Sequence, residues 1–183
     1  MTSASAAAML QALGAGEPAP ALAGKLALYG RFIGSWQLDV TYYPGGGTPL
    51  RAEGEWHFAW ALDGRAVQDV WIFPARHLRQ GGQPAEPWHM YGTTVRWYDP
   101  TIDAWRITWF DPSRPFELRQ IGRAVGPDIV QLGEDRNGLY DRWRFVEIGA
   151  DSFRWLADRS WDRGANWTLL MEMQARRVPE APS

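Results

Sequence analysis

The sequence predicts an all-β protein: a ten-stranded antiparallel up-and-down barrel with a short N-terminal helix. Ten segments after residue 33 alternate apolar and polar side chains, which is the pattern of half-buried strands. The connections between most of them are short and rich in glycine, proline and aspartate, so successive strands should pair antiparallel. Closing such a sheet into a barrel removes its exposed edges.

The helical part precedes the strands. Residues 22–32 carry apolar side chains at helical spacing, which predicts a short helix across one barrel mouth. Residues 1–21 are rich in alanine and then in proline, and we expect a flexible arm there. With 183 residues the chain fits one domain, so we assign 22–177 to the barrel and 178–183 to a C-terminal tail.

The strands follow from Trp36 onward, where Trp36, Leu38, Val40 and Tyr42 share one face. Glycine-rich or Asp-Gly and Asp-Pro turns separate several of the later segments. The connection 74–87 is unusually long and suggests a rim or portal. The predicted strands cover residues 36–42, 50–61, 65–73, 90–98, 104–110, 116–125, 129–134, 139–148, 153–161 and 167–177.

Composition narrows the classes of function. A net charge of -2 with scattered arginines gives little support for nucleic-acid binding. No run approaches the ~18 apolar residues of a membrane span, and the N-terminus lacks a recognisable signal peptide, so we expect a cytoplasmic protein. The absence of cysteine excludes disulfides and thiolate chemistry. A homodimer is left open.

One motif has a local structural explanation. Residues 160–167 read Ser-Trp-Asp-Arg-Gly-Ala-Asn-Trp, the Asp-box pattern that sialidase propellers use as a hairpin turn. Asp162 can accept backbone hydrogen bonds, Gly164 can take a positive φ, and Trp167 can pack beneath them. We interpret this segment as a turn.

Several short motifs lie along the chain: Phe32-Ile33-Gly34-Ser35-Trp36, Leu62-Asp63-Gly64-Arg65, Tyr98-Asp99 with Trp105 and Trp109, the Ser160 to Trp167 turn and Arg176-Arg177. Through these motifs, residues 30–177 resemble uncharacterised bacterial lipocalin-like families of the calycin, or fatty-acid-binding-protein-like, barrel superfamily. The resemblance implies a lipocalin-like barrel with an internal cavity, and no established reaction comes with it.

Tryptophan is the compositional anomaly, with 12 in the chain. Large aromatic side chains either fill a core or line a pocket. We therefore predict that the barrel binds a small hydrophobic or aromatic molecule, with a structural module whose lumen is filled as an alternative. The predicted ligand-binding residues are Trp36, Tyr42, Trp56, Trp60, Arg65, Trp71, Arg96, Trp97, Trp109, Arg119, Trp155 and Met171.

Enzymatic function is a further alternative. Asp69 shares a strand face with aromatic residues, where its pKa would be raised and it could serve as the base of a cofactor-free isomerase, lyase or hydratase, with Tyr98 or an inward arginine as partner. An Asp–Arg pair that orders the barrel wall is the explanation of Asp69 that we favour, because ion pairs inside barrels are common and no histidine is adjacent in the sequence. Arginines 96, 106, 119 and 123 could clamp a ligand carboxylate or simply lie exposed on their strands.

Cofactors and metals are not expected. The three histidines, at 57, 77 and 89, form no metal-binding pattern. A haem site like that of the related nitrobindins would need a histidine in the C-terminal half, and none follows His89. The sequence also has no nucleophile elbow and no phosphate-binding loop.

Overall fold

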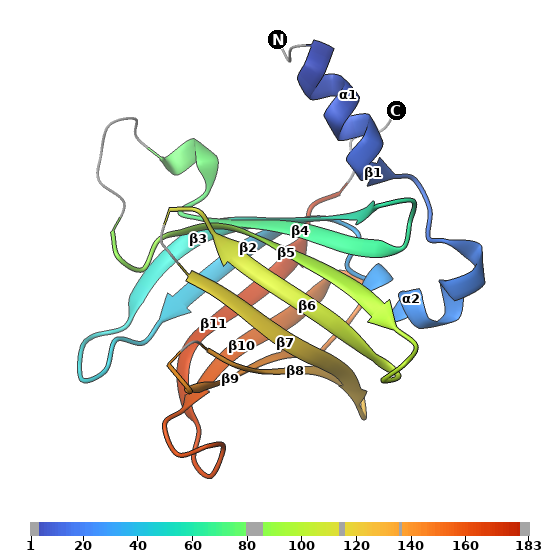
Figure 1. The fold of residues 1–183 in the computed structure, drawn as a ribbon. Coiled ribbons are helices and arrows are strands. Elements are labelled where there is room, and N and C mark those ends of the chain that lie inside the picture. Colours follow the sequence, from blue (N-terminus) through green and yellow to red (C-terminus); the bar gives the residue numbers. More distant parts are fainter. Residues whose placement is uncertain (1–3, 80–85, 114–115, 136, 180–183) are drawn as a thin grey trace.

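The computed structural model describes residues 4–79, 86–113, 116–135 and 137–179 (Figure 1). Within them the chain forms a closed ten-stranded antiparallel barrel, which confirms the predicted fold class. The barrel strands are β2 (Gly34–Tyr42), β3 (Leu50–Ala61), β4 (Ala66–Phe73), β5 (Met90–Asp99), β6 (Ala104–Asp111), β7 (Phe116–Val125), β8 (Asp128–Glu134), β9 (Tyr140–Val146), β10 (Ser152–Ser160) and β11 (Thr168–Arg177).

Each strand of the barrel pairs with the next one along the chain, and the ends of the sheet meet. β11 pairs with β2, from Met171 opposite Tyr42 to Arg177 opposite Trp36. The predicted closure through the first and last strands is therefore confirmed. Because the sheet closes on itself, each of the ten strands has a hydrogen-bonded neighbour on both sides.

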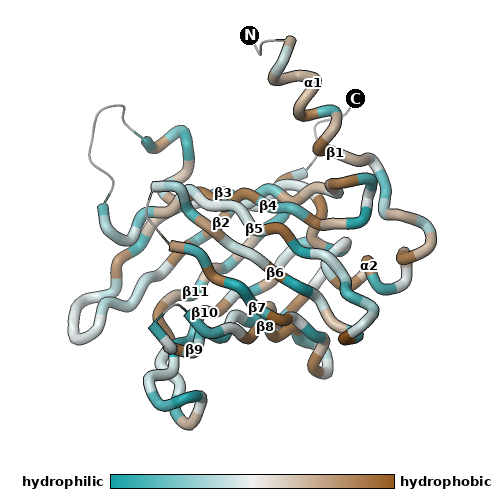
Figure 2. Tube along the Cα trace, viewed as in Figure 1, coloured by the Kyte–Doolittle hydropathy of each residue, from teal (hydrophilic) through white to brown (hydrophobic). Residues whose placement is uncertain are grey.

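The alternation of side chains places the core inside the barrel, and Figure 2 shows hydropathy changing from residue to residue along the strands. On β4 the side chains of Val67, Asp69, Trp71 and Phe73 are buried, which shows the inward face of a strand whose orientation the sequence left open. Aromatic residues of several strands meet at the centre, where they remove a large apolar area from water at about 25 cal/mol per Å². The central rings are Trp36, Trp56, Phe58, Phe145 and Phe153.

The helix α2 (Ala23–Gly30) covers one mouth of the barrel and follows a short 3₁₀ turn, Pro20–Leu22. Its Leu26 and Tyr29 side chains are fully buried. The Tyr29 ring packs edge-on against Trp105 at 4.6 Å between centroids, and its hydroxyl accepts a 2.9 Å hydrogen bond from Gln131. Helix and barrel therefore form one continuous core at this mouth, as the sequence predicted.

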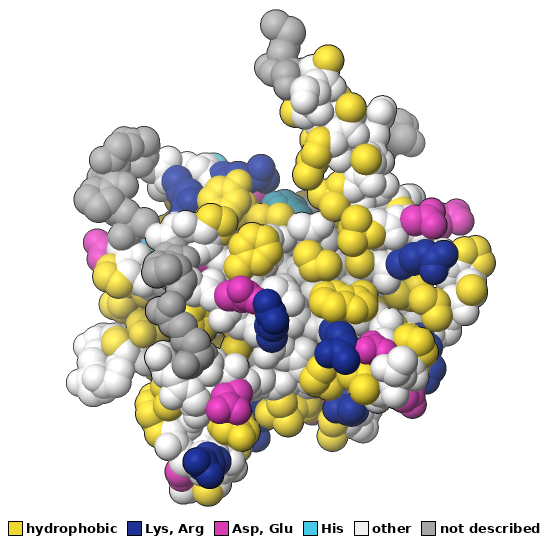
Figure 3. Space-filling view, viewed as in Figure 1, with side chains coloured by type: hydrophobic (Ala, Val, Ile, Leu, Met, Phe, Trp, Pro, Cys, Tyr) yellow, Lys and Arg dark blue, Asp and Glu magenta, His cyan; other side chains and the backbone are white. Residues whose placement is uncertain are grey.

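The N-terminal arm consists of helix α1 (Ala4–Leu13) and a short strand, β1 (Gly14–Ala15). β1 pairs with the end of β3, so this part of the arm is attached to the sheet. Helix α1 has no buried side chain and projects from the barrel with apolar side chains on its surface (Figure 3). Neither α1 nor α2 has the length and apolar character that a helix needs to cross a membrane, and the described residues contain no other α-helix.

The β10–β11 connection forms the turn that the Asp-box pattern predicted. The Asp162 carboxylate accepts hydrogen bonds from the backbone N–H of Asn166 at 2.8 Å and from the Ser160 hydroxyl at 2.7 Å. Gly164 has φ +90°, which disfavours any residue with a side chain. The whole motif is explained by this turn.

Candidate functional site

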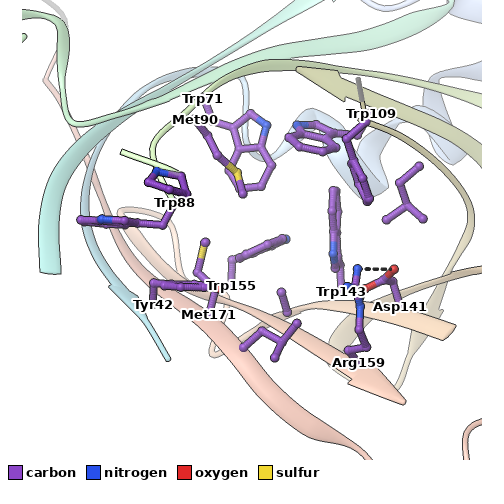
Figure 4. Close-up of a pocket in the computed structure, with 15 residues that line it drawn as sticks. Tyr42, Trp71, Trp88, Met90, Trp109, Asp141, Trp143, Trp155, Arg159 and Met171 are labelled. Atoms are coloured by element: carbon purple, nitrogen blue, oxygen red, sulfur yellow. Dashed lines mark hydrogen bonds and ion pairs between the residues drawn. The ribbon is translucent and has the colours of Figure 1, made fainter. Parts of the chain in front are cut away.

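A pocket of about 240 Å³ lies inside the barrel at the mouth opposite α2 (Figure 4). Its walls come from both halves of the chain. Strand β2, strands β4 to β7 and strands β9 to β11 all contribute side chains, because they surround one lumen in the closed barrel. Most of the lining is apolar or aromatic. The lining residues are Tyr42, Trp71, Pro87, Trp88, Met90, Trp109, Phe116, Leu118, Asp141, Trp143, Trp155, Ala157, Arg159, Leu170 and Met171.

Four tryptophans, Trp71, Trp109, Trp143 and Trp155, pack in a compact cluster at the inner end of the pocket, and we call this cluster the tryptophan ring; Trp71 and Trp143 also contact each other across it, at 5.6 Å between centroids. The ring centroids of Trp71 and Trp109 lie 5.4 Å apart, those of Trp109 and Trp143 5.7 Å, and those of Trp143 and Trp155 5.1 Å. Trp155 closes the ring on Trp71 at 5.1 Å. All five contacts are edge-to-face, the geometry that aromatic quadrupoles favour. The ring gives the pocket a rigid aromatic floor.

The outer part of the pocket is bounded by Tyr42 of β2 and Trp88, which precedes β5. Their rings are nearly parallel, with 8° between the planes and 6.3 Å between centroids. Figure 4 shows them at the side of the pocket with Met90 and Met171 between them and the tryptophan ring. Methionine side chains are flexible and polarizable, so they can adapt to an aromatic ligand.

The pocket also contains one ion pair, formed by Asp141 of β9 and Arg159 of β10. The two residues are paired in the sheet, and Arg159 donates from Nε and Nη2 to the two carboxylate oxygens at 3.0 Å each. The Asp141 side chain is 6% exposed and that of Arg159 23%. Burial raises the pKa of the Asp141 carboxyl, while Arg159 acts to lower it. This pair is the polar feature of an otherwise apolar wall.

A second buried ion pair lies deeper in the barrel, on the α2 side of the tryptophan ring. Asp69 of β4 accepts a hydrogen bond from Nη1 of Arg96 of β5, and both side chains are 0% exposed. The Arg96 guanidinium also lies over the rings of Tyr29, Phe58 and Phe145, at 5.3 to 5.8 Å from their centroids. Burial raises the pKa of Asp69, and the adjacent Arg96 opposes that shift. Asp69 is therefore paired with an arginine, as the Asp–Arg alternative requires, and the partner is Arg96.

The predicted ligand-binding residues fall into three places. Five of them line the pocket: Tyr42, Trp71, Trp109, Trp155 and Met171. Four are buried in the core nearer α2 and do not line it: Trp36, Trp56, Trp60 and Arg96.

The remaining three, Arg65, Trp97 and Arg119, lie outside the lumen. Arg65 belongs to the β3–β4 turn, where the alternation of the strand has not begun, and its side chain points into solvent. Trp97 and Arg119 occupy outward positions on β5 and β7 and border a hollow on the outer surface. Arg96, the residue before Trp97, points to the opposite side of β5, and its side chain is buried in the barrel.

Asp69 and Tyr98, the candidate catalytic residues, are not brought together. Asp69 is paired in the sheet with Thr94, whereas Tyr98 is four residues further along β5, about 13 Å at 3.3 Å per residue. The Tyr98 hydroxyl donates to Asp103 at the α2 end, and Lys25 donates to the same carboxylate at 2.6 Å. A catalytic base and the hydrogen-bond donor that assists it must converge on one reacting atom. Asp69 and Tyr98 lie in different parts of the barrel wall and do not converge.

Several residues that line the pocket were not predicted from the sequence, including Trp88, Trp143 and the Asp141–Arg159 pair. Trp143 and Asp141 alternate with outward Arg142 and Arg144 on β9, so strand parity was a signal that could have found them. Trp88 lies in the connection before β5, where no periodicity indicates which way a side chain points.

Within the described ranges, no group of three or more histidine, aspartate or glutamate side chains is arranged to hold a metal ion. The fold and the pocket define the architecture of the protein: a closed antiparallel up-and-down barrel with an aromatic internal pocket open at one end. This architecture is compatible with binding a small molecule.

Several solved structures are similar to this chain, and two of them show the extent of the likeness. Rv2717c from M. tuberculosis aligns with a TM-score of 0.59 and 15% identity over 89% of this chain and 100% of its own. The S-type phycobiliprotein lyase CPES from Guillardia theta aligns with a TM-score of 0.56 and 9% identity over 85% of this chain and 93% of its own. At such identities the likeness concerns the fold alone. No protein-family model and no characterised protein sequence matches the chain.

Proposed function

We propose that the protein binds a small, mainly apolar aromatic molecule in the pocket at the open mouth of the barrel. The observation that carries this proposal is the cavity of about 240 Å³ bounded by aromatic rings and two methionines. Typical ligand pockets hold about 300 Å³ or more, so this one suits a ligand of one or two rings.

The site is confined to one end of the lumen. Beyond the tryptophan ring the interior is filled by Trp56, which lies 5.5 Å from Trp71 between centroids, and by the aromatic cluster under α2. A barrel filled over its whole length would favour the structural-module alternative. The open mouth, with Trp88 and Tyr42 at its side, favours binding instead.

The enzymatic alternative has less support, although one of the similar structures is named a lyase. The Asp69 carboxylate accepts a hydrogen bond from Arg96, and the Tyr98 hydroxyl donates one to Asp103. Each candidate catalytic group is thus engaged with a different partner. Cytoplasmic location and a homodimer are further predictions from the sequence.

Isothermal titration calorimetry with 2-naphthalenemethanol tests the proposal. We expect saturable binding to the wild type and loss of binding in Ala157→Phe, because Ala157 lines the pocket and a phenyl ring there would occupy it. Val125→Phe adds the same ring at an exposed position and serves as the matched control. Equal binding by all three proteins, or no binding by a folded wild type, would contradict the proposal.

A further inference from the structure

The ion pair in the pocket bears on the charge of the ligand. Asp141 and Arg159 face each other across β9 and β10, and both oxygens of the carboxylate and two nitrogens of the guanidinium are used in their mutual hydrogen bonds. The pair lines the pocket together with apolar and aromatic side chains. Its charges cancel, so the pocket wall has no net charge at this point.

A ligand carboxylate would gain little binding free energy from contact with this ion pair. Arg159 is already neutralised by Asp141, and the negative charge of Asp135 also acts on Asp141. An anion would therefore lose its hydration and meet a carboxylate at close range, and both effects are costly inside a protein. An uncharged hydroxyl or amide can donate to the carboxylate and accept from the guanidinium, and it loses far less hydration.

We propose that the Asp141–Arg159 pair selects an uncharged ligand: an aromatic molecule with one hydroxyl or amide group, in preference to a carboxylate of the same shape. The pair acts as a neutral polar patch that orients the ligand while the tryptophan ring holds its aromatic body. This inference rests on the proposed function and specifies the chemical class of its ligand.

Three probes of one shape test the inference: 2-naphthalenemethanol, 2-naphthoate and 2-naphthylmethylammonium, titrated calorimetrically at pH 7. The wild type should bind the alcohol at least about tenfold more tightly than the carboxylate, because the carboxylate meets like charge at the wall. A carboxylate that binds as tightly as the alcohol would overturn the inference while the proposed function stands. Failure of every probe to bind the folded wild type would contradict the proposed function itself.

Two variants change the charge of the wall with little change in shape. Asp141→Asn leaves the positive charge of Arg159 uncompensated, so the affinity for 2-naphthoate should rise about tenfold relative to the affinity for the alcohol. Arg159→Gln leaves the negative charge of Asp141 uncompensated, so in this variant the affinity for 2-naphthylmethylammonium should rise instead. Urea denaturation confirms that each variant is folded, and the three-probe comparison on the wild type stands alone if one is not. Unchanged selectivity in two folded variants would also overturn the inference.

Discussion

Asp69 and Arg96 form an ion pair at the centre of the barrel in which neither side chain reaches solvent. Removing one partner of such a pair leaves a buried charge without compensation, whereas removing both need not destabilise the fold. The pair therefore supports stability only as a unit.

Arg96→Met should lower the free energy of unfolding by about 3–5 kcal/mol, because it isolates the Asp69 carboxylate in the core. Asp69→Leu combined with Arg96→Met should recover most of that loss. Arg106→Met, at a half-exposed position on β6, should change stability by about 0.5 kcal/mol or less. Urea denaturation measures all three, and a double variant no more stable than Arg96→Met would refute this account of the pair.

Much of the barrel could be predicted from the sequence because period-2 alternation is local. The predicted strand 50–61 coincides with β3, and Asp69 and Trp71 share one face of β4 as their spacing predicted, although the spacing did not show which face points inward. The prediction of lumen residues failed at Arg65, which lies in a turn, and at Trp97 and Arg119, which occupy outward positions within β5 and β7.

The candidate site was harder to predict, since it depends on which side chains meet across strands. The partner of Asp69 is Arg96, which lies 27 residues away, and Asp141 meets Arg159 on the neighbouring strand. Strand parity indicates which groups share a face of a strand, but their distances depend on register and side-chain conformation. The same holds for the empty volume, because the sequence does not determine which tryptophans fill the lumen and which border the pocket.

Trp36 should be a major source of stability. Its ring is buried against Phe153 at 4.7 Å between centroids, and its indole N–H donates to the Phe32 carbonyl at 2.7 Å. Trp36→Ala should lower the free energy of unfolding by about 3–5 kcal/mol, as measured by thermal or chemical denaturation. Trp161→Ala removes a ring that is 59% exposed and should be nearly neutral. Equal effects of the two substitutions would show that Trp36 is not part of the core.

Gly122 permits the close approach of α2 to the barrel. A Cβ atom there would lie 2.5 Å from the Tyr29 hydroxyl and 2.7 Å from Ile107. Gly122→Ala should therefore destabilise the protein by about 1–3 kcal/mol and displace Tyr29. Gly24→Ala, within α2 and facing open space, should instead stabilise by about 0.5 kcal/mol. A neutral Gly122→Ala in differential scanning calorimetry would show that α2 is loosely docked.

Glu55 should contribute to stability above pH 4.5. Arg76 donates to its carboxylate from the backbone N–H, Nε and Nη2, which lowers the pKa of Glu55 from 4.5 to about 2. A carboxyl whose pKa is lower in the folded state stabilises above its unfolded pKa and loses this contribution as the pH falls from about 4.5 to 2.

The contribution should be about 1 kcal/mol, because Arg76 is largely exposed and solvent screens the pair. Glu55→Gln should therefore flatten the decline in stability between pH 5 and pH 3, as measured by urea denaturation. A decline as steep as in the wild type would rule out this role for Glu55.

The most direct measurement of ligand binding is a crystal structure with 6-bromo-2-naphthol, in which anomalous scattering locates the bromine. The account predicts one bromine site inside the barrel mouth, with the naphthalene rings against Trp71, Trp155 and Met171 and the hydroxyl on the Asp141–Arg159 pair. Bromine found only on the outer surface, with the pocket residues in contact with one another, would contradict it.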